Sequence, residues 1–299
     1  MIKIIQKSDE GKDYKFSIVI PTWNNLDLLK ICLKSIQDNS RFSHQIIVHV
    51  NEGIDGTLDW LQSNFDGDIT FSKDNKGICY PLNYCAQLVN TDYYCYFNDD
   101  MYACPDWDLP LWEAIEKKVD NLFFFSGTQI QPFSFWDSSI IANQNFGTEA
   151  NDFREQELLD KFNLPEKEDW SGATWPPNVV HIDMWRMAGG YSIEFSPGMY
   201  SDPDFSMKLW KLGVRDFRGL SDSRVYHFES KSTSKVRKNK GADQFLAKWG
   251  ISSRMFGKHY LKRGKKYDGP LSDVDKETLS YKTDSIRNFF KRVAKAMFP

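Results

Sequence analysis

The sequence predicts an α/β protein with a mostly parallel central sheet flanked by helices, followed by a helical C-terminal extension. Short runs of consecutive apolar residues alternate with segments of helical spacing, which is typical of a parallel sheet covered on both faces. Several of these runs end in Pro, Asn, Asp and Gly, the residues of turns. With 299 residues, the chain can bury a sizeable core as one large domain with appendages.

The first third of the chain predicts four strands in alternation with three helices. The expected strands are residues 16–20, 45–50, 69–71 and 93–97. The expected helices run from Leu26 to about Asn39, from Thr57 through Leu61, and over 81–89. Asp55 or Thr57 can cap the second helix.

The rest of the chain has a looser pattern. Strands are expected at 122–125, 179–182 and 225–228, and a loop at 170–178. Helices are expected at 109–119, 152–162, 244–249 and 253–260. Asp183 is expected to cap a short helix that ends at Gly189-Gly190, and Asp202, followed by Pro203, to start another.

Composition excludes several classes of protein. The net charge of −3 provides no global basic field for nucleic acid. The 5 Cys form no Cys-x-x-Cys pair, which indicates buried thiols in a reducing compartment. Residues 1–7 are too short and too rich in Lys for a signal peptide, and no apolar run approaches the ~20 residues of a membrane span. We therefore expect a cytoplasmic protein, with peripheral attachment to a membrane left open.

The stretch from Tyr93 to Met101 is the strongest candidate for a functional site. An apolar run ends there at Asn98, Asp99 and Asp100, and polar groups at the carboxyl ends of parallel strands stand where open α/β folds bind ligands. Two adjacent carboxylates favour a cation such as Mg²⁺ or Mn²⁺, which in turn favours phosphate. An ordinary turn is the alternative interpretation of the same residues.

Five segments together resemble the nucleotide-sugar glycosyltransferases of family 2, with the GT-A fold. They are Ile18–Asn24, Asn51–Thr57, Asn75-Lys76-Gly77 with Asn83, Asn98-Asp99-Asp100, and Gly189-Gly190-Tyr191 with Ser201-Asp202-Pro203-Asp204. Three features depart from the family pattern: Asn98 replaces the first Asp of the metal motif, Ser201 replaces a Glu, and the acidic loop with Asn51 and Glu52 is one residue short. The Gln-x-x-Arg-Trp motif of the processive synthases is absent, so the resemblance implies a non-processive enzyme that adds a single sugar.

The resemblance also implies a domain organisation. We expect a GT-A catalytic domain over 1–228, with a nucleotide-binding half at about 14–105 and an acceptor half at about 106–228. A mobile basic loop and helical extension would occupy 229–280, and a basic amphipathic helix 281–299. Lys231, Lys235, Arg237, Lys238 and Lys240 of the loop are either a solvated run or a lid that closes on the diphosphate.

The implied reaction moves a sugar from a UDP- or dTDP-sugar to a hydroxyl of a glycan or a lipid-linked acceptor, with inversion at the anomeric carbon. Mn²⁺ or Mg²⁺ would stabilise the leaving diphosphate, held by Asp100, by His227 and by Asn98. Asp202 would be the base that deprotonates the acceptor, with Asp204 as the fallback. The alternatives are a helix-capping Asp202 and a purely structural His227.

The remaining site residues follow from the same resemblance. The expected nucleotide-binding residues are Pro21, Thr22, Trp23, Asn24, Asn51, Glu52, Lys76, Gly77, Asn83, Asn98 and Asp99. Trp170 and Trp175 either stack on the acceptor sugar or plug the core.

Three questions of function stay open at this point. A non-catalytic nucleotide- or carbohydrate-binding protein on the same fold is the alternative, because of Asn98 and Ser201. A sugar-1-phosphate nucleotidyltransferase is disfavoured, because Pro21-Thr22-Trp23-Asn24 is unlike a Gly-rich phosphate loop. The apolar stripe and basic flanks of 285–298 indicate a membrane-surface helix, a helix docked on the body, or a coiled-coil segment.

Overall fold

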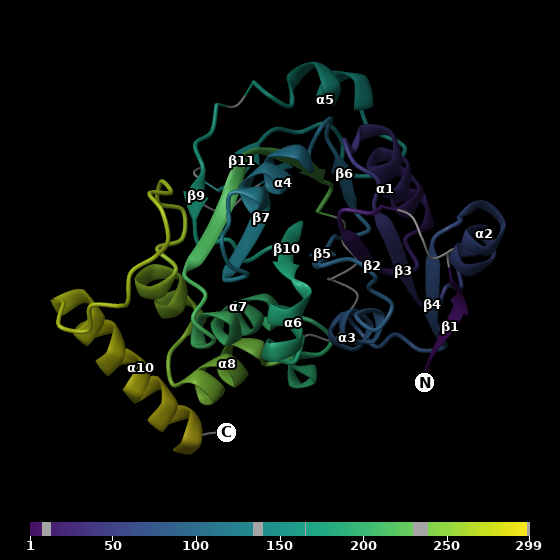
Figure 1. Ribbon diagram of the computed structural model, residues 1–299. Helices are drawn as coiled ribbons and strands as arrows, with labels where there is room; N and C mark the ends of the chain where they lie inside the picture. Colours follow the sequence, from purple (N-terminus) through teal and green to yellow (C-terminus); the bar gives the residue numbers. More distant parts are fainter. Residues whose placement is uncertain (8–12, 134–139, 165, 230–238, 298–299) are drawn as a thin grey trace.

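The computed structural model describes residues 1–7, 13–133, 140–164, 166–229 and 239–297. Within these residues, eleven strands form one twisted sheet with helices on both sides (Figure 1). The strand order is β1-β4-β3-β2-β5-β10-β7-β11-β6, with β8 beside β7 and β9 beside β11. Most of the basic loop predicted at 229–240 lies outside the described residues.

The four strands expected in the first third of the chain are present as β2 to β5, whereas β1 was not expected, and further unexpected strands occur later. Their bounds are β1 Ile2–Gln6, β2 Ser17–Trp23, β3 Gln45–Asn51, β4 Asp68–Ser72, β5 Tyr93–Tyr96, β6 Met101–Ala103, β7 Phe123–Gln131, β8 Ala142–Asn143, β9 Trp170–Ser171, β10 Asn178–His181 and β11 Asp216–His227. The strands β2, β3, β4 and β5 are parallel, whereas β1, β10 and β6 pair antiparallel with their neighbours.

The helices cover the two faces of the sheet. Their bounds are α1 Leu26–Asn39, α2 Thr57–Asn64, α3 Cys79–Cys85, α4 Leu109–Glu116, α5 Glu155–Lys161, α6 Ile182–Ala188, η1 Ile193–Phe195, α7 Ser201–Lys211, α8 Gly241–Trp249, α9 Ser253–Met255, the π-helical turn η3 Phe256–Tyr260 and α10 Leu279–Met297. Figure 1 shows α3, α6, α7 and α8 on one side and α1 with α4 on the other.

Two apolar clusters fill the space between the sheet and these helices. Along β2, Ile18 and Ile20 face the cluster under α1 and α4, whereas Val19 between them faces the cluster under α3, α6 and α7. This alternation follows from the period of two in a strand. Phe245 of α8 and Phe256 of η3 belong to the second cluster, so the segment after β11 contributes to the main core.

The order of the strands fixes where a site can form. The chain runs outward from β2 through β3 to β4, and then returns to β5 on the opposite side of β2. Open α/β sheets bind ligands at such a reversal, outside the carboxyl ends of the strands. Trp23 at the end of β2 and Asn98 after β5 lie at this edge.

Three local expectations need correction. Asp183 does not cap α6. His181 is the capping residue, and its ring accepts a hydrogen bond from the backbone N–H of Asp183 at 3.2 Å. Asp202 does not cap α7, which begins one residue earlier, after Tyr200 at a φ of 70°. Residues 170–178 are not wholly a loop, because this stretch contains β9 and the start of β10.

Asp55 bonds to the first residue of α2, although Gly56 and not Asp55 stands at the N-cap position. Its carboxylate accepts hydrogen bonds from the backbone N–H and the hydroxyl of Thr57, at 3.1 and 2.6 Å. Its second oxygen accepts from the N–H of Leu26, the first residue of α1, at 2.9 Å. One side chain therefore joins the N-termini of two helices, where a negative charge is favourable.

Candidate active site

A cavity of about 650 Å³ opens at the reversal of strand order. Its walls come from the ends of β2, β5, β7 and β11, the loops that precede α3 and α7, and the loop between β9 and β10. Eleven of the residues predicted from the sequence line it: Pro21, Thr22, Trp23, Asn51, Gly77, Asn98, Asp99, Asp100, Trp175, Asp202 and His227. Segments far apart in the sequence therefore meet in one place.

The acidic pair and His227 lie together on one wall of this cavity. The Nε2 atom of His227 lies 3.3 Å from Oδ1 of Asp100. Burial and the charge of Asp100 raise the pKa of Asp99 to about 7, although Thr22, Asn25 and the backbone of Trp23 favour its ionised form. Burial alone would lower the pKa of His227, but Asp100 and other nearby carboxylates outweigh it and raise this pKa.

Two glutamines orient the ring of His227. The side-chain amide of Gln129 donates to the backbone carbonyl of Pro176, and its oxygen accepts from Gln131 at 2.6 Å. The amide nitrogen of Gln131 in turn lies 2.9 Å from Nδ1 of His227. Neither glutamine was expected from the sequence, because the predicted strand ended at residue 125, although a Gln-x-Gln pair at a strand end places both side chains on one face.

The donor set fits a divalent ion. A carboxylate oxygen of Asp100 and a ring nitrogen of His227 face the same space, and Asn98, Asp99 and Glu229 add oxygens to the lining. Manganese accepts both oxygen and imidazole ligands. No cluster of three or more His, Cys, Asp or Glu suited to a metal occurs in the described part of the chain. Substrate oxygens would therefore have to complete the coordination.

Asp202 lies at the start of α7 and faces the same cavity. The hydroxyl of Tyr191 donates to its Oδ1 at 3.0 Å. Burial raises the pKa of Asp202 to about 7, and Tyr191 and the charge of Arg263 only partly oppose this rise. A carboxylate with a pKa near neutrality is suited to taking a proton from a substrate.

Trp175 lines the same cavity as Asp202, and Arg263 packs against Trp175. The guanidinium of Arg263 stacks on the ring of Trp175 at 4.9 Å and donates to the hydroxyl of Thr174 at 3.1 Å. Burial lowers the pKa of Arg263 to about 10, and the charge of Asp202 opposes this fall. Nothing in the sequence around residue 263 singled this arginine out.

Asp204 and Trp170 are corrections to the expected site. Asp204 is fully buried behind the cavity, where it accepts from Ser192 at 2.6 Å and from the indole of Trp249 at 2.8 Å. Trp170 donates to the hydroxyl of Thr128 at 3.0 Å, and its ring covers Gly219 so closely that a Cβ there would lie 1.9 Å from it. Both side chains belong to the buried interior, which for Trp170 was the alternative interpretation from the sequence.

Four expected nucleotide-binding residues shape the loops around the cavity and are not among its lining residues. Glu52 accepts from Trp23 at 2.7 Å and from Asn24 at 3.2 Å, which ties β2 to the loop after β3. Asn83 binds both backbone polar groups of Tyr191 at 2.7 Å. The ammonium of Lys76 lies 3.3 Å from Asp74.

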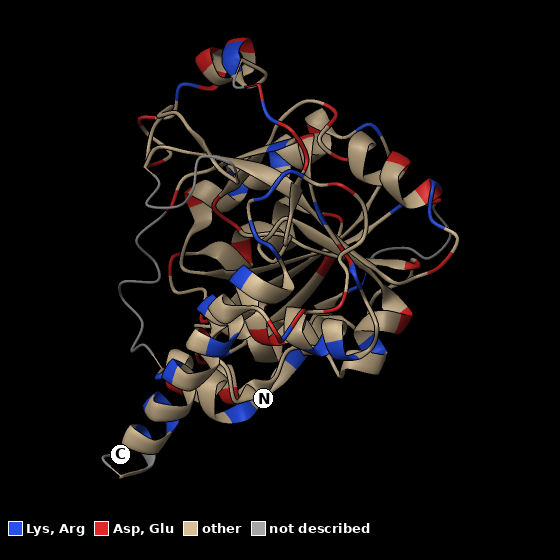
Figure 2. Ribbon diagram, turned by 90° about the vertical axis from the view of Figure 1, so that its left-hand side faces the viewer, with Lys and Arg blue, Asp and Glu red and all other residues tan. Residues whose placement is uncertain are grey.

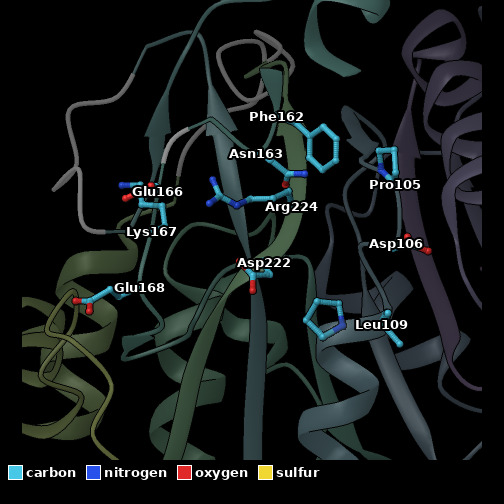
Figure 3. Close-up of a pocket in the computed structure, with 11 residues that line it drawn as sticks. Pro105, Asp106, Leu109, Phe162, Asn163, Glu166, Lys167, Glu168, Asp222 and Arg224 are labelled. Atoms are coloured by element: carbon cyan, nitrogen blue, oxygen red, sulfur yellow. The ribbon is translucent and has the colours of Figure 1, made fainter. Parts of the chain in front are cut away.

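A larger hollow of about 860 Å³ lies elsewhere on the protein (Figure 3). Its lining includes Arg224 and Asp222 of β11 and Phe162 after α5, but none of the predicted site residues is among its described lining. We assign function to the smaller cavity because it collects the acidic and imidazole side chains at the sheet edge, whereas size alone says nothing about chemistry.

The comparison with protein families decides the assignment. The model of the family described as "Glycosyl transferase family 2" matches residues 17–164, which span β2 to α5. This segment belongs to glycosyl transferase family 2. The matched segment contains the Asn98-Asp99-Asp100 motif, whereas Asp202 and His227 lie beyond it.

Solved structures share the fold of this chain at low sequence identity. The crystal structure of S. aureus TarS 1-349 in complex with UDP-GlcNAc has a TM-score of 0.55 and 15% identity over 78% of this chain and 64% of that one. GalNAc-T7 with UDP, GalNAc and Mn²⁺ has a TM-score of 0.53 and 15% identity, over 78% of this chain and 45% of that one.

Another crystal structure of S. aureus TarS 1-349 has a TM-score of 0.51 and 15% identity over 71% of this chain. This chain covers 60% of that structure's length, so the likeness concerns only part of it. None of the curated proteins compared with the chain matches it. These likenesses establish the GT-A fold.

Proposed function

We propose that the protein transfers a sugar from a UDP-sugar to a hydroxyl of a glycan or lipid-linked acceptor. The observation that carries this proposal is one cavity at the sheet edge, lined on one wall by Asp100 with His227 and also by Asp202. Family membership supports the reaction class. The choice of uridine follows the similar structures, whose names state UDP or UDP-GlcNAc as bound.

The residues divide the work between the leaving group and the acceptor. Asp100 and His227, with Asn98 and Asp99 beside them, would hold a divalent ion against the two phosphates. When bound, this ion supplies Lewis-acid stabilisation of the charge that grows on the leaving diphosphate. Thr22, Trp23 and Asn51 line the part of the cavity nearest β2, where the nucleoside is expected.

Asp202 removes the proton of the acceptor hydroxyl as that oxygen attacks the anomeric carbon. Its pKa near 7 leaves it largely ionised at slightly alkaline pH, with enough basicity for the transfer. Tyr191 fixes the carboxylate by its hydrogen bond, and Trp175 offers an aromatic face to a sugar. Attack from the side opposite the diphosphate inverts the anomeric configuration.

The deciding experiment is a screen of nucleotide sugars for release of nucleoside diphosphate, with Mn²⁺, with Mg²⁺ and with EDTA. We expect turnover of one or more UDP-sugars that requires the ion, and loss of turnover in Asp202→Asn with donor binding retained. Absence of turnover for every donor, with no donor binding by calorimetry, would refute the proposal.

The non-catalytic alternative is tested by the same variant. Asn98 and Ser201 depart from the family pattern, and Asn98 lines the cavity beside Asp99. A protein that binds a UDP-sugar tightly, yet turns over no faster than its Asp202→Asn variant with any acceptor, is a binding protein and not a transferase.

A further inference from the structure

The helix α10 docks on the protein body through its polar side. Four residues at helical spacing make this contact: Tyr281, Asp284, Asn288 and Lys295. Asn288 is 4% exposed; it accepts from the N–H of Ser252 at 3.1 Å and donates to Sδ of Met255 at 2.9 Å. These hydrogen bonds fix which side of α10 faces the protein body.

Two ion pairs reinforce this contact. Asp284 accepts from Lys258 at 2.7 Å and from His259 at 2.8 Å, and these two partners lower its pKa to about 2. Lys295 lies 2.9 Å from the carboxylate of Asp243 in α8. Figure 1 shows α10 at the edge of the molecule, next to α8.

The apolar side of α10 faces away from the body. Ile286 lies two residues before Asn288, and Phe290 lies two residues after it. In a helix with 3.6 residues per turn, each of these side chains therefore points about 160° away from the direction of Asn288. Their exposed fractions are 58% and 64%, and Phe289 and Met297 are 59% and 62% exposed. Amphipathic helices on globular proteins normally present the opposite side to the core.

Positive charge flanks this apolar side. The helix has five basic residues and one acidic residue, and Figure 2 shows the basic ones along its length. Lys282, Arg287 and Lys291 are exposed beside the apolar stripe. Long basic side chains can extend from an apolar surface to a charged one, which matches the headgroup region of an anionic bilayer.

We propose that α10 binds the surface of an anionic membrane, with its apolar side in the interface and its polar side on the protein. A second copy of the chain is a poorer occupant, because pairing two such faces would bring their basic flanks together. No helix within the described residues is long and apolar enough to cross a bilayer, so the contact would be peripheral.

Flotation of the full chain with vesicles tests this proposal. We expect binding to phosphatidylcholine vesicles that contain 30% phosphatidylglycerol, and at least tenfold weaker binding to phosphatidylcholine alone. The double variant Ile286→Ser/Phe290→Ser should lose at least tenfold in binding, and Arg287→Gln/Lys291→Gln should lose binding only to the anionic vesicles. The matched control is Met187→Ser/Ile193→Ser, which removes two apolar side chains that are 65% and 49% exposed elsewhere.

The result can also contradict the proposal. Failure of the parent chain to bind either vesicle would overturn it, and so would equal losses in the control and in Ile286→Ser/Phe290→Ser. A parent dimer that the same double variant converts to a monomer, without vesicle binding, would assign the face to a second copy. Thermal unfolding of each variant verifies that it is folded.

Discussion

Asp202 occupies a helix start without serving the helix. An aspartate followed by proline at the first turn is a strong capping signal, yet its carboxylate bonds Tyr191 and faces the cavity. Burial of this carboxylate raises its pKa to about 7. Keeping it ionised in such a place costs stability, and functional sites are where such costs are found.

Asp202→Asn should therefore remove activity and increase stability at the same time. Loss of a general base lowers turnover by about 10²- to 10⁴-fold. Because the pKa of the native state is raised, the native state binds this proton more tightly than the unfolded state, and the ionised form destabilises the fold. The gain in the free energy of unfolding should be on the order of 1 to 3 kcal/mol at pH 8 and should vanish near pH 4.

Urea denaturation at the two pH values measures this gain. If Asp202 were a helix cap, Asp202→Asn would change the stability little at either pH, because Asn also caps helices. A variant with normal turnover would remove Asp202 from the mechanism.

Tyr191→Phe should shift the pH dependence of the reaction upward. The hydroxyl of Tyr191 donates to Asp202 and lowers its pKa, so its removal leaves the base protonated to a higher pH. Activity should rise with pH up to a plateau above about 7 in the parent. The rising limb should move to higher pH in the variant, with kcat/KM reduced up to about tenfold at pH 6.5 and less at pH 9. If the pH dependence of activity were the same in Tyr191→Phe and in the parent, the rising part would reflect the titration of a group other than Asp202.

The sequence predicted the charged members of the site but not their support. Asp100 stands out because it follows an apolar run, whereas Asp202 and His227 were expected from the family resemblance. Gln131 and Arg263 act through neighbours that only the folded chain provides. Trp170 and Trp175 are five residues apart in similar surroundings, and only packing decides that one fills the core and the other lines the cavity.

At the scale of elements, α7 is tied to α8 through Asp204. Its carboxylate accepts from the indole of Trp249 and from Ser192, and Lys248 lies 2.9 Å away. The start of α7 holds Asp202 in the cavity, so this buried contact positions the proposed base. The carboxylate of Asp204 is itself fully buried, which separates the two aspartates in role although they are two residues apart.

Asp204→Ala should cost about 2 to 4 kcal/mol of stability, because it leaves buried donors without their acceptor. Asp204→Asn, which keeps one acceptor oxygen, should cost less. Chemical denaturation gives the two values, and turnover below the unfolding midpoint provides the check. If Asp204→Ala were stable and inactive while Asp202→Asn remained active, Asp204 would be the base after all.

Helices and strands with a strong period were predictable, and irregular ones were not. The bounds of α1 agree with the expectation from its apolar spacing. By contrast, β7 continues beyond its apolar run to Gln131, where Gln129 and Gln131 face the cavity, and β11 begins at Asp216, well before the apolar run that identified it. A site built from polar strand ends removes the hydrophobic signal that would reveal those ends.

At the scale of the whole molecule, the alternation of elements predicts a covered parallel sheet, and the structure confirms it. The antiparallel insertion of β10 between β5 and β7 was not predictable, because the pairing partner of a four-residue strand depends on the entire fold. This insertion brings Pro176 and Trp175 to the cavity. The second half of the chain therefore completes a site whose first half resembles a nucleotide-binding fold.

Such a composite site predicts that nucleotide and metal stabilise the protein together. A ligand at 100 times its Kd adds about 2.7 kcal/mol, which corresponds to roughly 4 to 5 °C in Tm for a chain of 299 residues. UDP with Mn²⁺ should give this shift, whereas UDP with EDTA should give little, because the diphosphate then faces Asp99 and Asp100 without a counterion. His227→Ala should reduce the shift obtained with Mn²⁺, and Asp202→Asn, on another part of the cavity wall, should retain it. Equal shifts with Mn²⁺ and EDTA would mean that the diphosphate is held by other cations of the protein, and Asp100 and His227 would then lose their proposed role.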